Sequence, residues 1–144
     1  MRALTVWQPF ATLLAERHKK IETRSWSTNV RGAVAIHSAI KPFKEVKKLI
    51  NPKSITAISN LLYPFLLDRL PTGYVLAAGN LVDCKRIDEA FLETLSPTER
   101  ILGDYTIGRY AWILEDVKHF KTPILAKGSQ GFWNWEVPDG IEIA

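Results

Sequence analysis

The residues best suited to chemistry are gathered in the stretch HKKIETRSW, residues 18–26. If the chain is extended from Ile21 onward, Glu22, Arg24 and Trp26 share one side of the strand, because side chains alternate. A carboxylate there can accept from an exocyclic amino group, and a guanidinium can grip a phosphate or a carbonyl edge. This division of roles suits a nucleotide. A mutual surface ion pair, worth about 0 to 1 kcal/mol, is the alternative.

Lys19 stands near the start of the same stretch. Its ammonium offers three hydrogen-bond donors, and burial can lower the pKa of a lysine enough for it to act as a base. Both roles require a cleft, whereas an exposed lysine at the end of a helix would only complement the helix dipole. If the protein is an enzyme, Lys19 and Glu22 are the candidate catalytic residues.

Five tryptophans offer aromatic faces to a nucleobase. Stacking on such a face is worth about 1 to 3 kcal/mol per base. Most tryptophans in a small barrel pack in the core, and Trp112 is expected there because it lies in an apolar strand. Trp7 and Trp26 flank the ionic stretch and are therefore the predicted ligand-binding indoles.

A second candidate segment is KGSQG, residues 127–131. Its glycines let backbone approach a ligand, and Ser129 or Gln130 can supply hydrogen bonds to it. A hairpin turn would account for the same residues.

Metal and cofactor motifs are missing from the sequence. The three histidines and Cys84 show no HxxxH or CxxC spacing, so we expect no zinc site. Neither GxxxxGK[ST] nor GxGxxG occurs, and we predict no cofactor of those types. His37, which ends the run AVAIH, is either a general acid or base near a cleft or a satisfied histidine at a sheet edge.

Positive charge is concentrated in the first third of the chain. The formal net charge is +4, but residues 1–53 carry eleven Lys/Arg against three Asp/Glu, and residues 54–144 carry eight against twelve. A basic surface attracts phosphate-bearing partners through steering and counterion release. The lysines of KPFKEVKKL are also typical of a solvated helix face.

Length and composition predict a single domain, residues 1–144, with one compact core. One cysteine excludes an intrachain disulfide, and we expect the cytosol. The N-terminus lacks the apolar run of a signal peptide, and no stretch reaches the ~20 apolar residues that span a bilayer, so no membrane insertion is expected.

The hydrophobic pattern predicts an α+β fold, a small barrel or curved mixed sheet with helices outside it. The expected strands are residues 4–9, 21–26, 32–39, 73–87, 109–117 and one within 122–137. The expected helices are residues 9–18, a helix with Pro42 in its first turn and with Phe43, Val46, Leu49 and Ile50 inward, residues 54–62, and a short helix from Ser96 to Leu102. Residues 73–87 are either one long strand or a bent pair of strands, with a bulge or corner at Gly79. Ser96 with Glu99 predicts a capping box.

Four motifs in this order resemble the ASCH domain family: LTVWQPFATLL, KKIETRSWSTNVRG with AIHSA, GNLVDC, and YAWILEDV followed by PILAKGSQGFWNW. The resemblance extends from Arg2 to about Val137. It implies a PUA-like β-barrel of five or six mostly antiparallel strands with three or four helices packed outside.

The family signature GxKxxExR aligns with residues 17–24, so Lys19, Glu22 and Arg24 take its ionic positions. Arg17 replaces the usual glycine. If that glycine has a positive φ, arginine is strained there, and either the turn differs or the first helix runs further.

The resemblance also implies a cleft between barrel and helices that receives RNA or a nucleotide-like ligand, and we expect an RNA- or nucleotide-binding domain. Related branches are described as ribonucleases or as amidohydrolases of acylated cytidine, which makes hydrolysis the alternative. In the amidohydrolase branch a threonine with a proposed nucleophilic role stands where this chain has Glu22, which cannot act in that way. A protein-interaction module with an inert cleft is the third alternative, favoured if Glu22 and Arg24 form a fully buried pair.

Overall fold

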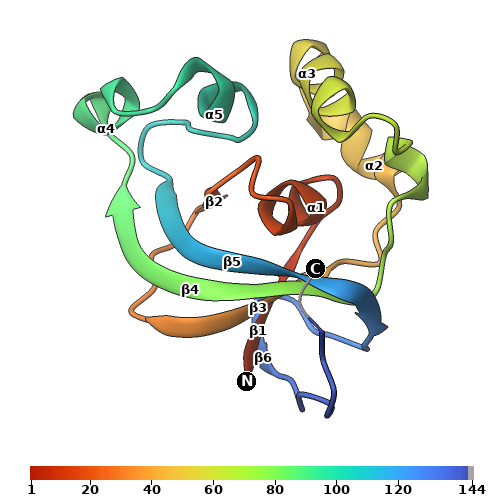
Figure 1. The fold of residues 1–144 in the computed structure, drawn as a ribbon. Helices are drawn as coiled ribbons and strands as arrows, with labels where there is room; N and C mark the ends of the chain where they lie inside the picture. Colours follow the sequence, from red (N-terminus) through yellow and green to blue (C-terminus); the bar gives the residue numbers. More distant parts are fainter. Residues whose placement is uncertain (143–144) are drawn as a thin grey trace.

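One mixed six-stranded sheet, ordered β2-β5-β4-β3-β1-β6, forms the frame of the protein. The structure is a computed structural model that describes residues 1–142. The strands are β1 (Arg2–Val6), β2 (Ile21–Arg24), β3 (Gly32–Ser38), β4 (Tyr74–Arg86), β5 (Tyr110–Leu125) and β6 (Phe132–Asn134). Within residues 1–142, β1 and β3 are the one parallel pair. The sheet curls into a half-barrel, as expected (Figure 1).

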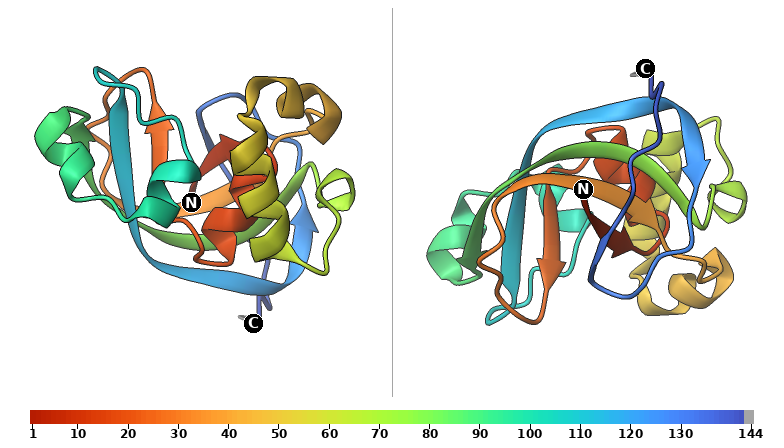
Figure 2. Two further views of the ribbon diagram at one scale, coloured as in Figure 1. Left: turned by 90° about the horizontal axis from the view of Figure 1, so that it is seen from above. Right: turned by 90° about the horizontal axis from the view of Figure 1, so that it is seen from below.

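Five α-helices lie around this sheet within the described part of the chain. They are α1 (Phe10–Ala15), α2 (Phe43–Val46), α3 (Pro52–Leu62), α4 (Glu89–Glu93) and α5 (Pro97–Ile101), with short 3-10 turns at Lys47–Leu49 and Leu67–Arg69. Helix α1 lies against the concave face, with α3 beside it and the α4–α5 pair toward β2 (Figures 1 and 2). The predicted α+β architecture is confirmed, and α4 is a short helix beyond those expected.

Two of the apolar clusters of the core position α1, α3 and α5. Between α1 and the sheet, Leu14 packs with Leu4, Ile36 and Trp112. On its other side, α1 contributes Leu13 to a cluster that joins it to α3 and α5; its buried members are Leu13, Ile58, Leu62, Leu67, Leu70 and Leu102. Apolar burial therefore sets the places of α3 and α5 around the end of β2.

Strand β4 is a single long strand with the predicted irregularity at Gly79. The register with β5 shifts between Ala78 and Asn80, and a Cβ on Gly79 would lie 2.8 Å from Val117 Cγ2. A close backbone approach of this kind requires glycine. The bend lets β4 and β5 curve around the core.

Three local predictions need correction. Leu49 is exposed rather than inward, because the chain leaves α2 after Val46 in a 3-10 turn, which changes the side-chain period from 3.6 to 3. Helix α3 starts at Pro52 instead of residue 54, since Asn51 Oδ1 accepts from Lys53 N at 2.9 Å as an N-cap. The residues TPIL belong to the end of β5 and not to a separate strand.

Arg17 adopts the left-handed conformation, with φ +63°. His18 N donates to Leu13 O at 3.0 Å and Arg17 N donates to Leu14 O at 3.1 Å, which is the hydrogen-bond pattern of a Schellman motif. The turn is therefore kept with arginine at the position where glycine is usual, and α1 does not run further. Arg17 Nη1 also donates to Val117 O at 3.4 Å.

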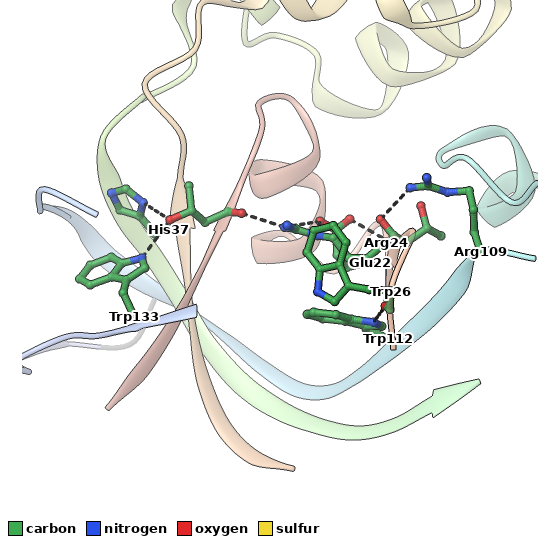
Figure 3. Close-up of polar contacts among 9 residues, drawn as sticks. Glu22, Arg24, Trp26, His37, Arg109, Trp112 and Trp133 are labelled. Atoms are coloured by element: carbon green, nitrogen blue, oxygen red, sulfur yellow. Dashed lines mark hydrogen bonds and ion pairs between the residues drawn. The ribbon is translucent and has the colours of Figure 1, made fainter. Parts of the chain in front are cut away.

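Thr5 of β1 forms hydrogen bonds with His37 and Trp133, which are both labelled in Figure 3. His37 Nε2 lies 2.8 Å from Ala126 O and must donate to it, which leaves Nδ1 to accept from Thr5 Oγ1 at 3.0 Å. The same hydroxyl accepts from Trp133 Nε1 at 2.9 Å. Burial lowers the pKa of His37, so the neutral ring is the stable form. Of the two interpretations of His37, the satisfied histidine is correct.

We predict that Arg17→Gly raises the free energy of unfolding by about 0.5 to 1 kcal/mol. A left-handed non-glycine residue costs about 1 to 2 kcal/mol, part of which is offset by the greater freedom of glycine in the unfolded chain. Urea denaturation measures the difference. Arg17→Ala is the control, since it keeps the Cβ and the strain, and a glycine variant no more stable than this alanine variant would contradict the account.

We predict that stability falls as the pH drops below about 6.5. The unfolded chain protonates His37 near its ordinary value of 6.5, while the folded chain resists protonation, so the contribution of the neutral ring is complete above 6.5 and is lost as the pH falls toward the lowered pKa. Thermal unfolding across this pH range tests it. In His37→Gln the dependence should flatten, and in the exposed-histidine variant His18→Gln it should persist; equal profiles for all three proteins would refute the prediction.

Candidate functional site

A cleft of about 580 Å³ opens at the end of β2, between α2 and α3 on one side and α5 with the segment after it on the other. Trp7, Lys19, Glu22 and Arg24, four of the predicted site residues, line it together. Its other walls come from the segment between α2 and α3, from α3 itself, and from the end of α5 with the segment after it; they include Leu49, Asn51, Ser54, Ile101, Gly103, Asp104 and Arg109. The cleft thus lies between elements far apart in the sequence.

Lys19 is the most buried ionic residue of this lining, with 2% of its surface exposed. Its Nζ lies 3.5 Å from Glu99 Oε2 and 3.4 Å from Tyr105 Oη. Burial lowers the pKa of Lys19, opposed by the charges of Glu99 and Glu22. Burial also raises the pKa of Tyr105 far above its usual range, so the phenol keeps its proton. Lys19 is therefore held in the site and is not an exposed cation at a helix end.

Glu99 is the carboxylate partner of the cleft residue Lys19, although sequence reasoning assigned it to a helix cap. Ser96 Oγ accepts from Glu99 N at 3.0 Å, as a capping box requires. The Glu99 carboxylate, however, does not reach back to the helix start: Oε1 accepts from Lys20 N at 2.9 Å and Oε2 faces Lys19. A buried ammonium and a backbone donor together hold the carboxylate across the cleft wall.

Glu22 and Arg24 form the predicted same-face pair. Arg24 Nε and Nη2 lie 3.0 Å and 2.9 Å from Glu22 Oε2, and Glu22 Oε1 accepts from Thr23 N at 3.1 Å. The side chains are 11% and 15% exposed, respectively, and both line the cleft. The pair is thus neither a free surface ion pair nor fully buried, so the condition that would favour an inert cleft is not met.

Arg24 also connects two strands that do not pair. Its Nη2 donates to Thr5 O of β1 at 2.8 Å, although β2 and β1 are separated by three strands in the sheet (Figure 3). Sequence reasoning did not find Thr5, because a backbone carbonyl carries no residue-type signal.

Arg109 and Asp104 form a second ionic pair on the cleft wall. Arg109 Nε lies 3.4 Å from Asp104 Oδ2, and Nη2 donates to Thr23 O at 3.2 Å. Burial raises the pKa of Asp104, but hydrogen bonds from Thr106 and the charge of Arg109 outweigh it and hold that pKa below its usual value. The cleft is therefore lined by cations that each have a carboxylate partner.

The two predicted indoles are both exposed but occupy different places. Trp7 is 42% exposed and lines the cleft, with Lys41 Nζ 4.1 Å from its ring centre. Trp26 is 51% exposed and is not among the lining residues. Trp112 is buried, as predicted.

Ser129 and Gln130 are exposed in the loop between β5 and β6, and neither lines the cleft in the described part of the chain. The loop is hydrogen-bonded to Thr5 of the cleft lining, whose N–H donates to Gly131 O at 3.2 Å. A role for these two side chains stays a prediction.

Within residues 1–142, no three His, Cys, Asp or Glu side chains are grouped so that they could hold a metal ion. No helix in that range is long and apolar enough to span a membrane.

Comparison with known proteins agrees with this architecture. The crystal structure of ASCH from Zymomonas mobilis superposes with a TM-score of 0.58 at 14% identity, covering 94% of this chain and 87% of that chain. A serine-to-alanine mutant of the Zymomonas mobilis protein gives a TM-score of 0.51 at 13% identity with the same coverage. These likenesses show the fold, and no curated protein matches. The ASCH domain model matches residues 4–124, most of the chain, and the protein therefore belongs to the ASCH domain family.

Proposed function

We propose that this protein binds RNA, or a nucleotide, in the cleft around Lys19, Glu22 and Arg24. The observation that carries the proposal is the cleft itself, where fixed ionic groups and an exposed indole line a space of about 580 Å³. That volume is typical of a small-ligand site and suits one nucleotide rather than a duplex.

The distribution of charge supports a base inside the cleft and phosphates at its rim. Inside, Lys19, Arg24 and Arg109 are matched by Glu99, Glu22 and Asp104. Further positive charge lies on exposed lysines from α2 to the first turn of α3, namely Lys44, Lys47, Lys48 and Lys53. Lysines of this kind attract phosphates without reading sequence, whereas paired polar groups read the edge of a base.

Arg24 is the residue best placed to contact the base. The contacts within the described chain use its Nε and Nη2, which leaves Nη1 for a ligand. Its guanidinium also lies 5.6 Å and 5.7 Å from the ring centres of Trp26 and Trp112, so it is held before any ligand arrives. Such preorganisation reduces the entropic cost of binding.

We predict that single-stranded RNA binds in a salt-dependent way and that Arg24→Ala weakens binding by about 10-fold or more. A hydrogen bond to a charged group is worth about 1.5 to 3 kcal/mol, and each phosphate contact changes the logarithm of the affinity by about 0.7 per decade of salt. Fluorescence anisotropy measures both effects.

Lys118→Ala removes an exposed lysine of β5 as the control and should bind as the wild type does. Arg24→Lys keeps the positive charge but removes the planar set of N–H donors of the guanidinium. A folded Arg24→Lys variant that binds RNA weakly would therefore show a loss of recognition and not a loss of folding. The proposal would be refuted if the wild type did not bind RNA, or if folded Arg24→Lys and Arg24→Ala bound RNA with the wild-type affinity.

Hydrolysis in the same cleft is a second candidate function, and the environment of Lys19 is what favours it. A lysine with a pKa lowered by burial, in a cleft beside a carboxylate and a phenol, is a candidate general base. Glu22, the other proposed catalytic residue, forms an ion pair with Arg24, and its negative charge opposes the lowering of the Lys19 pKa.

If the protein is a hydrolase, Lys19→Ala should slow cleavage of labelled RNA or acylated cytidine by about 10²- to 10⁴-fold. The wild-type rate should rise with pH through a value below 10.5, because the neutral amine is the base. The neighbouring variant Lys20→Ala is the control, since it removes an exposed ammonium and keeps the backbone N–H that binds Glu99. Equal turnover by all three proteins would show that Lys19 is not part of the mechanism. An absence of turnover by the wild type would exclude hydrolysis of these substrates and leave only the binding proposal.

A further inference from the structure

Trp26 is held rigidly although half of it is exposed. Its carbonyl accepts from Trp112 Nε1 at 3.1 Å, which fixes the backbone. Its ring meets the buried Trp112 edge to face, with the ring centres 6.2 Å apart, and the Arg24 guanidinium lies 5.6 Å from its ring centre (Figure 3). The remaining surface of the indole faces solvent.

This arrangement is suited to stacking. The indole already has its orientation, so a planar ligand that stacks on it orders little further. The adjacent guanidinium adds positive charge beside the exposed ring, where an anionic partner gains from it.

The position of Trp26 relative to the cleft decides what stacks there. Arg24 lines the cleft and Trp26 does not, yet the two side chains touch. Arg24 therefore lies between the inside of the cleft and the exposed indole. A strand whose first base contacts Arg24 inside the cleft would therefore bring its next base to the side of Arg24 where Trp26 lies.

We propose that Trp26 stacks the base next to the one held in the cleft, so that the ligand is a single strand of at least two nucleotides. This inference rests on the proposed function. It assigns the two exposed indoles separate roles: Trp7 lines the position of the first base, and Trp26 forms an outer subsite for its neighbour. A free mononucleotide fills only the first position.

The test compares a mononucleotide with a trinucleotide of the same base, each titrated into the wild type, Trp26→Ala, Trp26→Phe and Tyr63→Ala. Tyr63 is 82% exposed at the end of α3 and is the matched aromatic control. We expect the trinucleotide to bind the wild type more tightly. Trp26→Ala should reduce the trinucleotide affinity by about 5- to 150-fold, because stacking is worth about 1 to 3 kcal/mol per base, and should reduce the mononucleotide affinity much less, because Trp112 still contacts Arg24.

Trp26→Phe should retain most of the trinucleotide affinity, and Tyr63→Ala should match the wild type. Equal affinity of the wild type for the two ligands, or no effect of Trp26→Ala, would overturn the outer subsite while leaving the cleft as a nucleotide site. If Trp26→Ala reduced the affinities for both ligands equally, Trp26 would act only by positioning Arg24, and this result would also overturn the outer subsite. Failure of both ligands to bind the wild type would instead refute the proposed function.

Discussion

The hydrogen bond from Arg24 to the carbonyl of Thr5 is the constraint on which the site depends. It joins β2 to β1 across the open side of the half-barrel, where the backbones of the two strands do not pair. If they did pair, a continuous ladder of backbone hydrogen bonds would occupy this side. Because a single guanidinium joins the two strands instead, β2 is connected to β1 while the space beside Arg24 stays open as the cleft.

Lys19 adds a constraint that stability alone does not explain. Burying an ammonium carries a desolvation penalty of several kcal/mol, and a salt bridge to Glu99 at 3.5 Å does not generally outweigh it. An apolar side chain of similar size would fill the same space without the penalty. The buried cation makes physical sense where a ligand or a proton transfer uses it, which agrees with its place in the cleft lining.

Local rules predicted much of this molecule, and contacts between distant residues account for what they missed. Strand alternation correctly placed Glu22 and Arg24 on one face, and a lone glycine in a strand marked the bend at Gly79. The same reasoning assigned the Glu99 side chain to the cap of its own helix. A capping box can be recognised from four consecutive residues of the sequence, whereas a partner 80 positions away cannot. The Thr5–His37 hydrogen bond likewise joins two strands whose adjacency depends on the whole sheet order.

The pairing of charges inside the cleft favours a neutral ligand group there. A phosphate that entered would compete with Glu22 and Asp104 for their guanidinium partners and would lie close to both carboxylates. Like charges at such distances repel strongly away from bulk water. The edge of a base brings both donors and acceptors and can add to the existing pairs without breaking them. In the proposed complex the phosphates would instead lie outside the cleft, at its lysine-rich rim, where solvent accommodates them at little cost.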